Sequence, residues 1–139
     1  MKDIANLIGR VCLASIFIFE AVDTGLYTTL TKKLMNFYGF TWQVGFLYNG
    51  AIVALSIGAL LVLVGYRVGL GSILILCYWL PYTFVVYSFW MAPPLNQHFE
   101  AEMFLRNIAI AGGLLLLVSN GAGKYSIKRL LATTNVGKY

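Results

Sequence analysis

A long, nearly uncharged stretch in the middle of the chain constrains the fold more than any other feature. Between Lys33 and Glu100, the 66 residues 34–99 contain one formal charge, Arg67. Charged residues make up 11% of the 139-residue sequence, against about 25% in soluble domains. A soluble domain of this size exposes much of its surface and could not shield such a stretch from water. The pattern excludes a soluble monomer, a disordered chain and a nucleic-acid-binding protein, and it predicts a membrane protein.

Four apolar segments are long enough to cross a bilayer as helices, since one crossing takes about 20 residues. The sequence therefore predicts an all-α integral membrane protein, a single domain built as a bundle of four transmembrane helices. Charged residues inside the first and fourth segments are expected to extend towards the interface or to pair within the bundle. The predicted spans cover residues 4–27, 44–64, 68–91 and 101–119.

The connections between these segments differ in kind. Gly65–Arg67 leaves almost no loop, so the second and third spans should form a tight antiparallel hairpin. Residues 28–43 mix apolar and basic side chains at helical spacing, which indicates a short amphipathic helix lying in the interface after the first span. Pro93 and Pro94 are expected to break helical structure and to form an extended turn. Residues 120–139 form a basic tail that contains glycine.

The positive charges predict the orientation of the spans. With four spans and a first segment that is not cleaved, both termini and the turn at Arg67 lie on one side. Positive residues concentrate on the cytoplasmic side of membranes, so both termini are expected on the cytoplasmic or matrix side. That side carries seven positive residues against three: Lys2, Arg10, Arg67, Lys124, Lys128, Arg129 and Lys138 against Lys32, Lys33 and Arg106.

Small residues recur at every fourth position in two of the predicted spans. Gly50, Ala54 and Gly58 repeat in the second span, and Ala109 and Gly113 repeat in the fourth. Small side chains at this spacing allow helix backbones to approach closely in a membrane. We therefore expect these five residues to lie at helix-packing interfaces.

The sequence offers few groups for independent catalysis. His98 is the single histidine, which excludes a bis-histidine haem or a multi-histidine metal site within this chain. No nucleotide-binding or nucleophile motif is present. Cys12 and Cys77 lie in apolar runs without a CxxC motif, and we expect both to be buried. We predict no metal site, no catalytic residue and no cofactor bound by this chain alone.

Two acidic residues near the end of the first span form the first candidate site. Glu20 and Asp23 are three residues apart and so share a helix face. An aspartate at the centre of a transmembrane helix costs about 2.5–3.5 kcal/mol, so a central acid pair would need a partner and would make proton or quinone chemistry feasible. The polar run that begins at Thr28 favours the other interpretation, in which the acids lie at the interface and end the span.

A second polar cluster opens the fourth span. His98, Glu102 and Arg106 are four residues apart, with Asn107 beside them. Glu102 precedes Arg106 by four residues, the favourable orientation for a helical ion pair. The spacing favours a structural ion pair at the membrane boundary over a substrate or quinone headgroup site. In the quinone alternative, both clusters together would form a polar interior.

The fourth span also carries a resemblance to a known family. Residues 104–107, Phe-Leu-Arg-Asn, precede an apolar run that contains Gly-Gly-Leu-Leu at 112–115. This resembles the DoxX/DoxD family of small four-helix membrane proteins, whose fourth span opens with Phe-Leu-(Lys/Arg)-Asn. Residues 19–23 lie in the place of the family's first-span signature, and residues 56–65 match its glycine-rich second span. The likeness covers about residues 5–125. Leu55 stands where the family often has glutamate, and Thr24 stands where a lysine usually follows the first-span acid.

The resemblance implies a respiratory-membrane context more than a reaction. The family's name comes from a subunit associated with thiosulfate:quinone oxidoreduction and terminal oxidase complexes. The leading hypothesis is therefore a non-catalytic accessory subunit of a respiratory-chain complex, in the mitochondrial inner membrane or a prokaryotic plasma membrane. The alternative is the quinone-interacting membrane subunit of a thiosulfate:quinone-type oxidoreductase.

A small transporter is the third hypothesis, with Tyr78, Tyr82 and Thr83 as a weak polar path. The expected partners are other membrane subunits and lipids, with quinone or phospholipid at the protein surface. No nucleic acid is expected as a partner.

Overall fold

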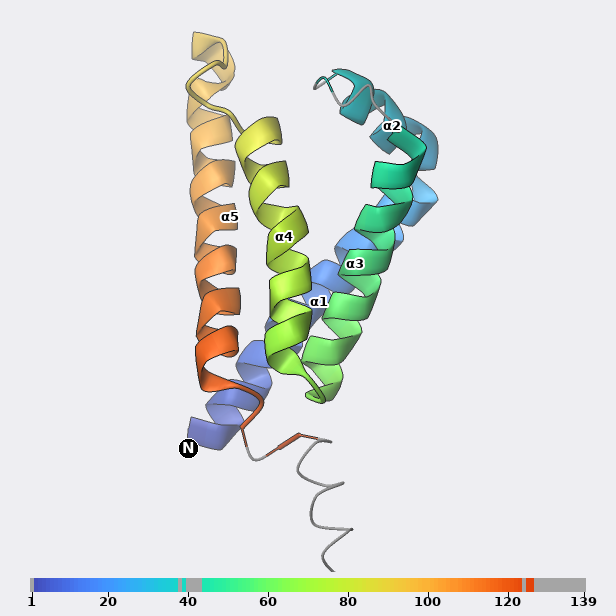
Figure 1. Ribbon diagram of the computed structural model, residues 1–139. Helices are drawn as coiled ribbons and strands as arrows, with labels where there is room; N and C mark the ends of the chain where they lie inside the picture. Colours follow the sequence, from blue (N-terminus) through green and yellow to red (C-terminus); the bar gives the residue numbers. More distant parts are fainter. Residues whose placement is uncertain (1, 38, 40–43, 124, 127–139) are drawn as a thin grey trace, which may run out of the picture.

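The computed structural model describes residues 2–37, 39, 44–123 and 125–126, and these form helices joined by turns. Figure 1 shows long helices that run side by side, with one short helix across the end of two of them. No strand occurs in this part of the chain. The helices are α1 (Lys2–Leu26), α2 (Thr28–Phe37), α3 (Val44–Val64), α4 (Val68–Val86) and α5 (Pro94–Asn120).

Three helices, α1, α4 and α5, are long and apolar enough to cross a membrane. They contain 25, 19 and 27 residues. The apolar part of α3, Tyr48–Val64, is shorter. Large apolar side chains such as Phe19, Leu60 and Leu116 are more than half exposed on the outside of the helices, where lipid is the suitable solvent. The prediction of a helical membrane protein is confirmed, and a fourth crossing, by α3, remains a prediction.

The bounds of the last two long helices differ from those of the predicted spans. The third was expected to reach residue 91, but α4 ends at Val86, and residues 87–93 form turns. The fourth was expected from residue 101, but α5 begins at Pro94. Pro94 starts the helix because the first helical position needs no backbone N–H donor and suits the fixed φ of proline.

The α3–α4 hairpin is the centre of the bundle. Its short turn contains Gly65, whose φ of +75° lies in the left-handed region that favours glycine. α1 packs along α3, α5 packs along α4, and α1 and α5 have only a small contact with each other. In Figure 1, α3 and α4 meet at the turn and diverge towards α2. α3 and α4 are therefore closest together at the end of the bundle that contains the turn.

Tyr48 joins three helices at the other end. Its side chain is buried, and its hydroxyl donates a hydrogen bond of 2.8 Å to the main-chain oxygen of Thr24 in α1. The Thr28 hydroxyl of α2 lies 2.8 Å from the same tyrosine oxygen. The Lys32 ammonium lies 4.9 Å from the ring centroid. The short helix predicted after the first span is present, and Tyr48 fixes it to α1 and α3.

The backbones of α3 and α4 approach most closely at Gly58 and Gly71. A Cβ atom added to Gly71 would lie 2.7 Å from the main-chain oxygen of Gly58 and 2.9 Å from Leu61 Cβ. A Cβ atom added to Gly58 would lie 2.9 Å from the main-chain oxygen of Gly71 and 2.6 Å from Ile75 Cγ1. Both positions therefore require glycine unless the helices move apart.

The other small residues that recur at every fourth position in α3 and α5 have different surroundings. Gly50 is exposed and faces open space, and Ala54 is half-buried. Ala109 is exposed, whereas a Cβ atom at Gly113 would lie 3.4 Å from the Leu13 side chain of α1. Gly58 and Gly113 thus lie at helix contacts, while Gly50 and Ala109 face outwards.

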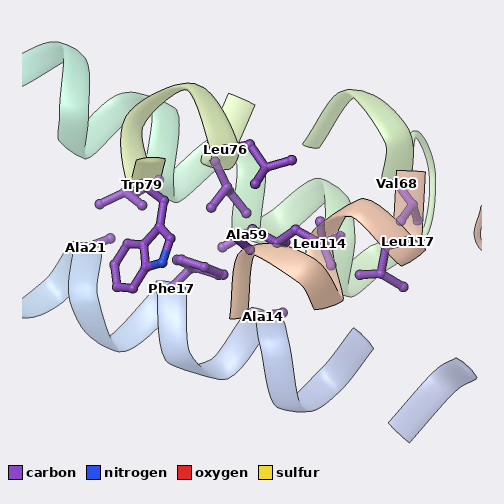
Figure 2. Close-up of a cluster of buried hydrophobic side chains, with 13 residues drawn as sticks. Ala14, Phe17, Ala21, Ala59, Val68, Leu76, Trp79, Leu114 and Leu117 are labelled. Carbon is purple, nitrogen blue, oxygen red and sulfur yellow. The ribbon is translucent and has the colours of Figure 1, made fainter. Parts of the chain in front are cut away.

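A hydrophobic core fills the space between the four long helices. Figure 2 shows Phe17 of α1 beside Trp79 of α4, with Leu114 of α5 close by. Phe17, Leu55, Ile75 and Leu114 are fully buried. The ring centroids of Phe17 and Trp79 are 5.0 Å apart in an edge-on arrangement, which adds to the area that both rings bury.

Both cysteines are exposed on the outer surface. The prediction that Cys12 and Cys77 are buried was therefore wrong. An apolar run inside a membrane does not distinguish the face that meets lipid from the face that meets the core, because both are apolar.

We predict that Gly71→Ala destabilises the protein by about 1–3 kcal/mol, the usual effect of overpacking, because the new methyl group would overlap the Gly58 carbonyl. Gly69→Ala in the same helix is the matched control, since Gly69 faces open space. The measurement is the free energy of unfolding in mixed detergent micelles. Equal stabilities of the two variants would contradict the close contact of α3 and α4.

Candidate functional site

The two acids of α1 lie near its end, on the side that meets α4. Glu20 is half-buried and Asp23 is exposed. The Glu20 carboxylate interacts electrostatically with Asp23 on its own helix and with the phenol groups of Tyr78 and Tyr82 on α4. Neither acid forms an ion pair with another described residue. Glu20 therefore faces tyrosines rather than a cation.

Aromatic side chains of α4 form a cluster beside the acid pair. The ring centroids of Tyr78 and Tyr82 are 5.7 Å apart and stacked, and Tyr82 also contacts Trp79 at 5.7 Å and Tyr87 at 6.0 Å. Trp79 in turn packs against Phe17 of α1. We call Phe17, Tyr78, Trp79, Tyr82 and Tyr87 the aromatic cluster. It gives this part of the bundle phenol hydroxyls and ring faces, with the Glu20 carboxylate at its edge.

The second predicted group lies on the outer surface of α5. His98, Glu102 and Arg106 are all exposed, and Arg106 Nη2 lies 3.1 Å from Glu102 Oε1. Both side chains of this ion pair are 56% exposed. A pair with this exposure contributes about 0–1 kcal/mol to stability in water. The ion pair is thus a surface feature of the first part of α5.

Asn107 is the one member of this group that turns inwards. It is buried, and its main-chain oxygen accepts a 3.3 Å hydrogen bond from Trp79 Nε1. This bond connects α5 to the aromatic cluster. The structure places Glu20 at this cluster, leaves Asp23 exposed on α1, and places His98, Glu102 and Arg106 on the outside of α5, so the six predicted residues do not form one polar interior. Among the described residues, no three His, Cys, Asp or Glu side chains are grouped as a metal site would require.

Within the part of the chain that the structure describes, the most buried charged side chain is Arg10, which the sequence predicted either to extend to the interface or to pair inside the bundle. It is 1% exposed. Its Nη2 donates a 2.6 Å hydrogen bond to the main-chain oxygen of Tyr125, in the segment after α5. The signal in the sequence was a lone arginine inside an apolar run, but its partner is a backbone carbonyl 115 residues away, which no local pattern could indicate.

Comparison with known proteins identifies the family. A model of the SURF4 family matches residues 1–130, and the chain belongs to that family. The chain is also similar to the inner membrane protein YqjF of Escherichia coli (strain K12), with 27% identity over 131 residues, which cover 94% of this chain and 95% of that protein. No solved structure shows significant similarity. Together with the long apolar helices, these findings identify a multi-pass membrane protein.

The family assignment corrects the resemblance to DoxX/DoxD. That resemblance depended mainly on the four-residue Phe-Leu-Arg-Asn motif at 104–107 and on glycine-rich apolar runs. Such runs are frequent in membrane helices. The SURF4 family model instead matches the chain almost from end to end.

Proposed function

We propose that this chain is a non-catalytic, four-span subunit that acts by binding other integral proteins of an energy-transducing membrane. The observation that carries the proposal is the acid pair Glu20 and Asp23, which is partly exposed at the side of α1 and has no cation in contact among the described residues. Carboxylates at membrane depth are costly unless they meet a partner. A basic or hydrogen-bond-donating side chain of a neighbouring subunit would supply that partner.

The count of four spans is supported by the geometry of the α3–α4 hairpin. α3 has 21 residues, which corresponds to a length of about 31 Å and matches a hydrocarbon core of about 30 Å. Because α3 runs antiparallel to α4 and packs along it, the two helices occupy the same depth. We therefore propose that α1, α3, α4 and α5 all cross the membrane.

The proposed membrane is the bacterial inner membrane or its mitochondrial counterpart. The name of YqjF refers to an inner membrane, and that membrane transduces energy. With four crossings, the seven positive residues around the termini and the Arg67 turn support a location of both ends of the chain on the cytoplasmic or matrix side. The more specific expectation of a respiratory complex depended in part on the corrected resemblance, so the proposal here is limited to a membrane complex.

Quinone binding is the second candidate function, and the aromatic cluster favours it. The stacked rings of Tyr78 and Tyr82 and the nearby Glu20 carboxylate combine flat apolar faces with polar groups, which suits a ring-bearing amphipathic ligand. The expectation that thiosulfate is the substrate depended only on the resemblance to DoxX/DoxD, which has been corrected. The experiment on the acid pair separates a quinone site from a subunit contact.

We predict that Glu20→Gln and Asp23→Asn reduce the amount of this chain retained in its native complex and leave turnover per assembled complex unchanged. An unpaired buried group at the subunit contact costs about 1–3 kcal/mol, so retention should fall several-fold. Glu102→Gln is the matched control, because Glu102 is an exposed acid on α5. Full retention with a large loss of normalised quinone-dependent turnover would instead establish the quinone site.

We also predict that Tyr125 and Lys33 lie on opposite sides of the membrane. Single cysteines at these exposed positions, in a protein with Cys12→Ser and Cys77→Ser, should react differently with a membrane-impermeant maleimide. The cysteine at 125 should react only in inverted vesicles, and the cysteine at 33 only in intact cells. Reaction of both from the same side would show an even number of crossings between them, and would contradict three crossings by α3, α4 and α5.

A further inference from the structure

The contact between α1 and α5 is confined to the half of the bundle that holds the α3–α4 turn. A Cβ atom at Gly113 of α5 would lie 3.4 Å from the Leu13 side chain of α1, and the whole contact between the two helices is small. In Figure 1, α1 starts near the last turns of α5 and then runs away from α5, towards α2. The sides of α1 and α5 that would continue the contact therefore do not meet.

The indole of Trp79 keeps α1 and α5 apart where their contact ends. Its ring centroid is 5.0 Å from that of Phe17 on α1, and its Nε1 donates a 3.3 Å hydrogen bond to the main-chain oxygen of Asn107 on α5. The side chain of Trp79 is 4% exposed, and Figure 2 shows it beside Phe17. α1 and α5 cannot close on each other at this level without displacing a buried ring.

The side of α1 that is left uncovered carries the acid pair. Residues three, four or seven apart share one face of a helix. The face that contacts α5 at Leu13 therefore continues through Ile16 and Glu20 to Asp23. Ile16 is 40% exposed, Glu20 is half-buried and Asp23 is exposed. We call Ile16, Glu20 and Asp23 the α1 stripe.

The corresponding side of α5 offers apolar side chains and no net charge. Followed back from Gly113 at the same spacing, this face contains Arg106, Glu102, Phe99 and Leu95. Arg106 and Glu102 form an ion pair with each other, so their charges cancel. Phe99 is 59% exposed and Leu95 is 92% exposed. We call these four residues the α5 stripe.

The charges of the two stripes indicate what can cover them. Tyr78 and Tyr82 of α4 are half-buried beside Glu20, and phenol groups bring no positive charge. The α1 stripe thus carries two carboxylates, and neither forms an ion pair with another residue that the structure describes. A molecule that covers both stripes must bring a positive charge to α1 and apolar surface to α5.

We infer that one transmembrane helix of a partner protein packs between the α1 stripe and the α5 stripe, with a lysine or arginine that pairs with the acid pair. The inference rests on the proposed subunit role and specifies its surface and its partner. A peptide segment at this depth must satisfy its backbone internally and is therefore helical. Each stripe extends along its helix for about 10 Å or more, which suits lengthwise packing of a third helix. The basic residue of that helix offsets the cost of the carboxylates.

The test places the photoreactive residue p-benzoylphenylalanine in the full-length chain, in its native membrane, at position 16 in one protein and at position 99 in another. Leu60 is the control position, because it is 54% exposed on α3 and belongs to neither stripe. Mass spectrometry identifies the cross-linked peptides. Positions 16 and 99 should both link to the same transmembrane segment of one partner, and that segment should contain a lysine or arginine. Position 60 should not link to it.

A charge exchange then tests the pairing itself. Glu20→Lys should abolish the cross-link from position 99, although that position lies on another helix. Replacing the basic residue of the cross-linked segment by glutamate should restore it. Glu20→Gln should weaken the cross-link several-fold and serves if Glu20→Lys does not fold. Glu100→Gln is the matched control and should leave the cross-link unchanged, because Glu100 is an acid of α5 outside the α5 stripe.

Failure of this inference and failure of the subunit role give different results. The inference alone is overturned if the chain is still recovered with a partner but one stripe does not link to it. Links from the two stripes to different segments, to a second copy of this chain or to lipid alone also overturn it, as does a cross-link that is unaffected by the change at Glu20. Both proposals fail if no position links to another protein and the chain is recovered alone.

Discussion

The close contact of Gly58 and Gly71 is the interaction on which the rest of the bundle depends. Lipid tails are as apolar as leucine, so helices in a membrane associate through close packing rather than through the hydrophobic effect. The two glycines allow α3 and α4 to approach until the Gly58 main-chain oxygen is 2.7 Å from the position that a Cβ atom at Gly71 would take. α1 and α5 then pack on the two sides of this hairpin, and the core around Phe17 and Trp79 closes between them (Figure 2).

Polar side chains fix the two ends of the apolar bundle. Tyr48 connects α1, α2 and α3 at one end, and Arg10 connects α1 to the segment after α5 at the other. Both bonds have main-chain oxygens as acceptors: Tyr48 donates to a carbonyl in the last turn of α1, where carbonyls lack partners within the helix, and Arg10 donates to the carbonyl of Tyr125, beyond the end of α5. The acid pair of α1 differs from both because it finds no cation or donor of this kind among the described residues. This difference is the reason for placing a partner protein there.

The sequence predicted the helices well and their contacts poorly. Long apolar runs are sufficient to identify spans, because a bilayer permits little other than helices. The same runs do not show which face is buried. Gly50 and Gly58 share one stripe, yet Gly50 faces open space and Gly58 contacts α4. Glu102 and Arg106 pair as their spacing predicts, because this contact is local. The Arg10 contact joins residues distant in sequence and was not predictable.

Native mass spectrometry of complexes extracted gently from the membrane tests the central claim most directly. The account predicts that this 15.4 kDa chain is recovered in a larger assembly with at least one other integral membrane protein, and that the isolated chain reduces no quinone. Recovery of the chain alone, or only with copies of itself, together with quinone-reducing activity, would contradict the proposal of a non-catalytic subunit.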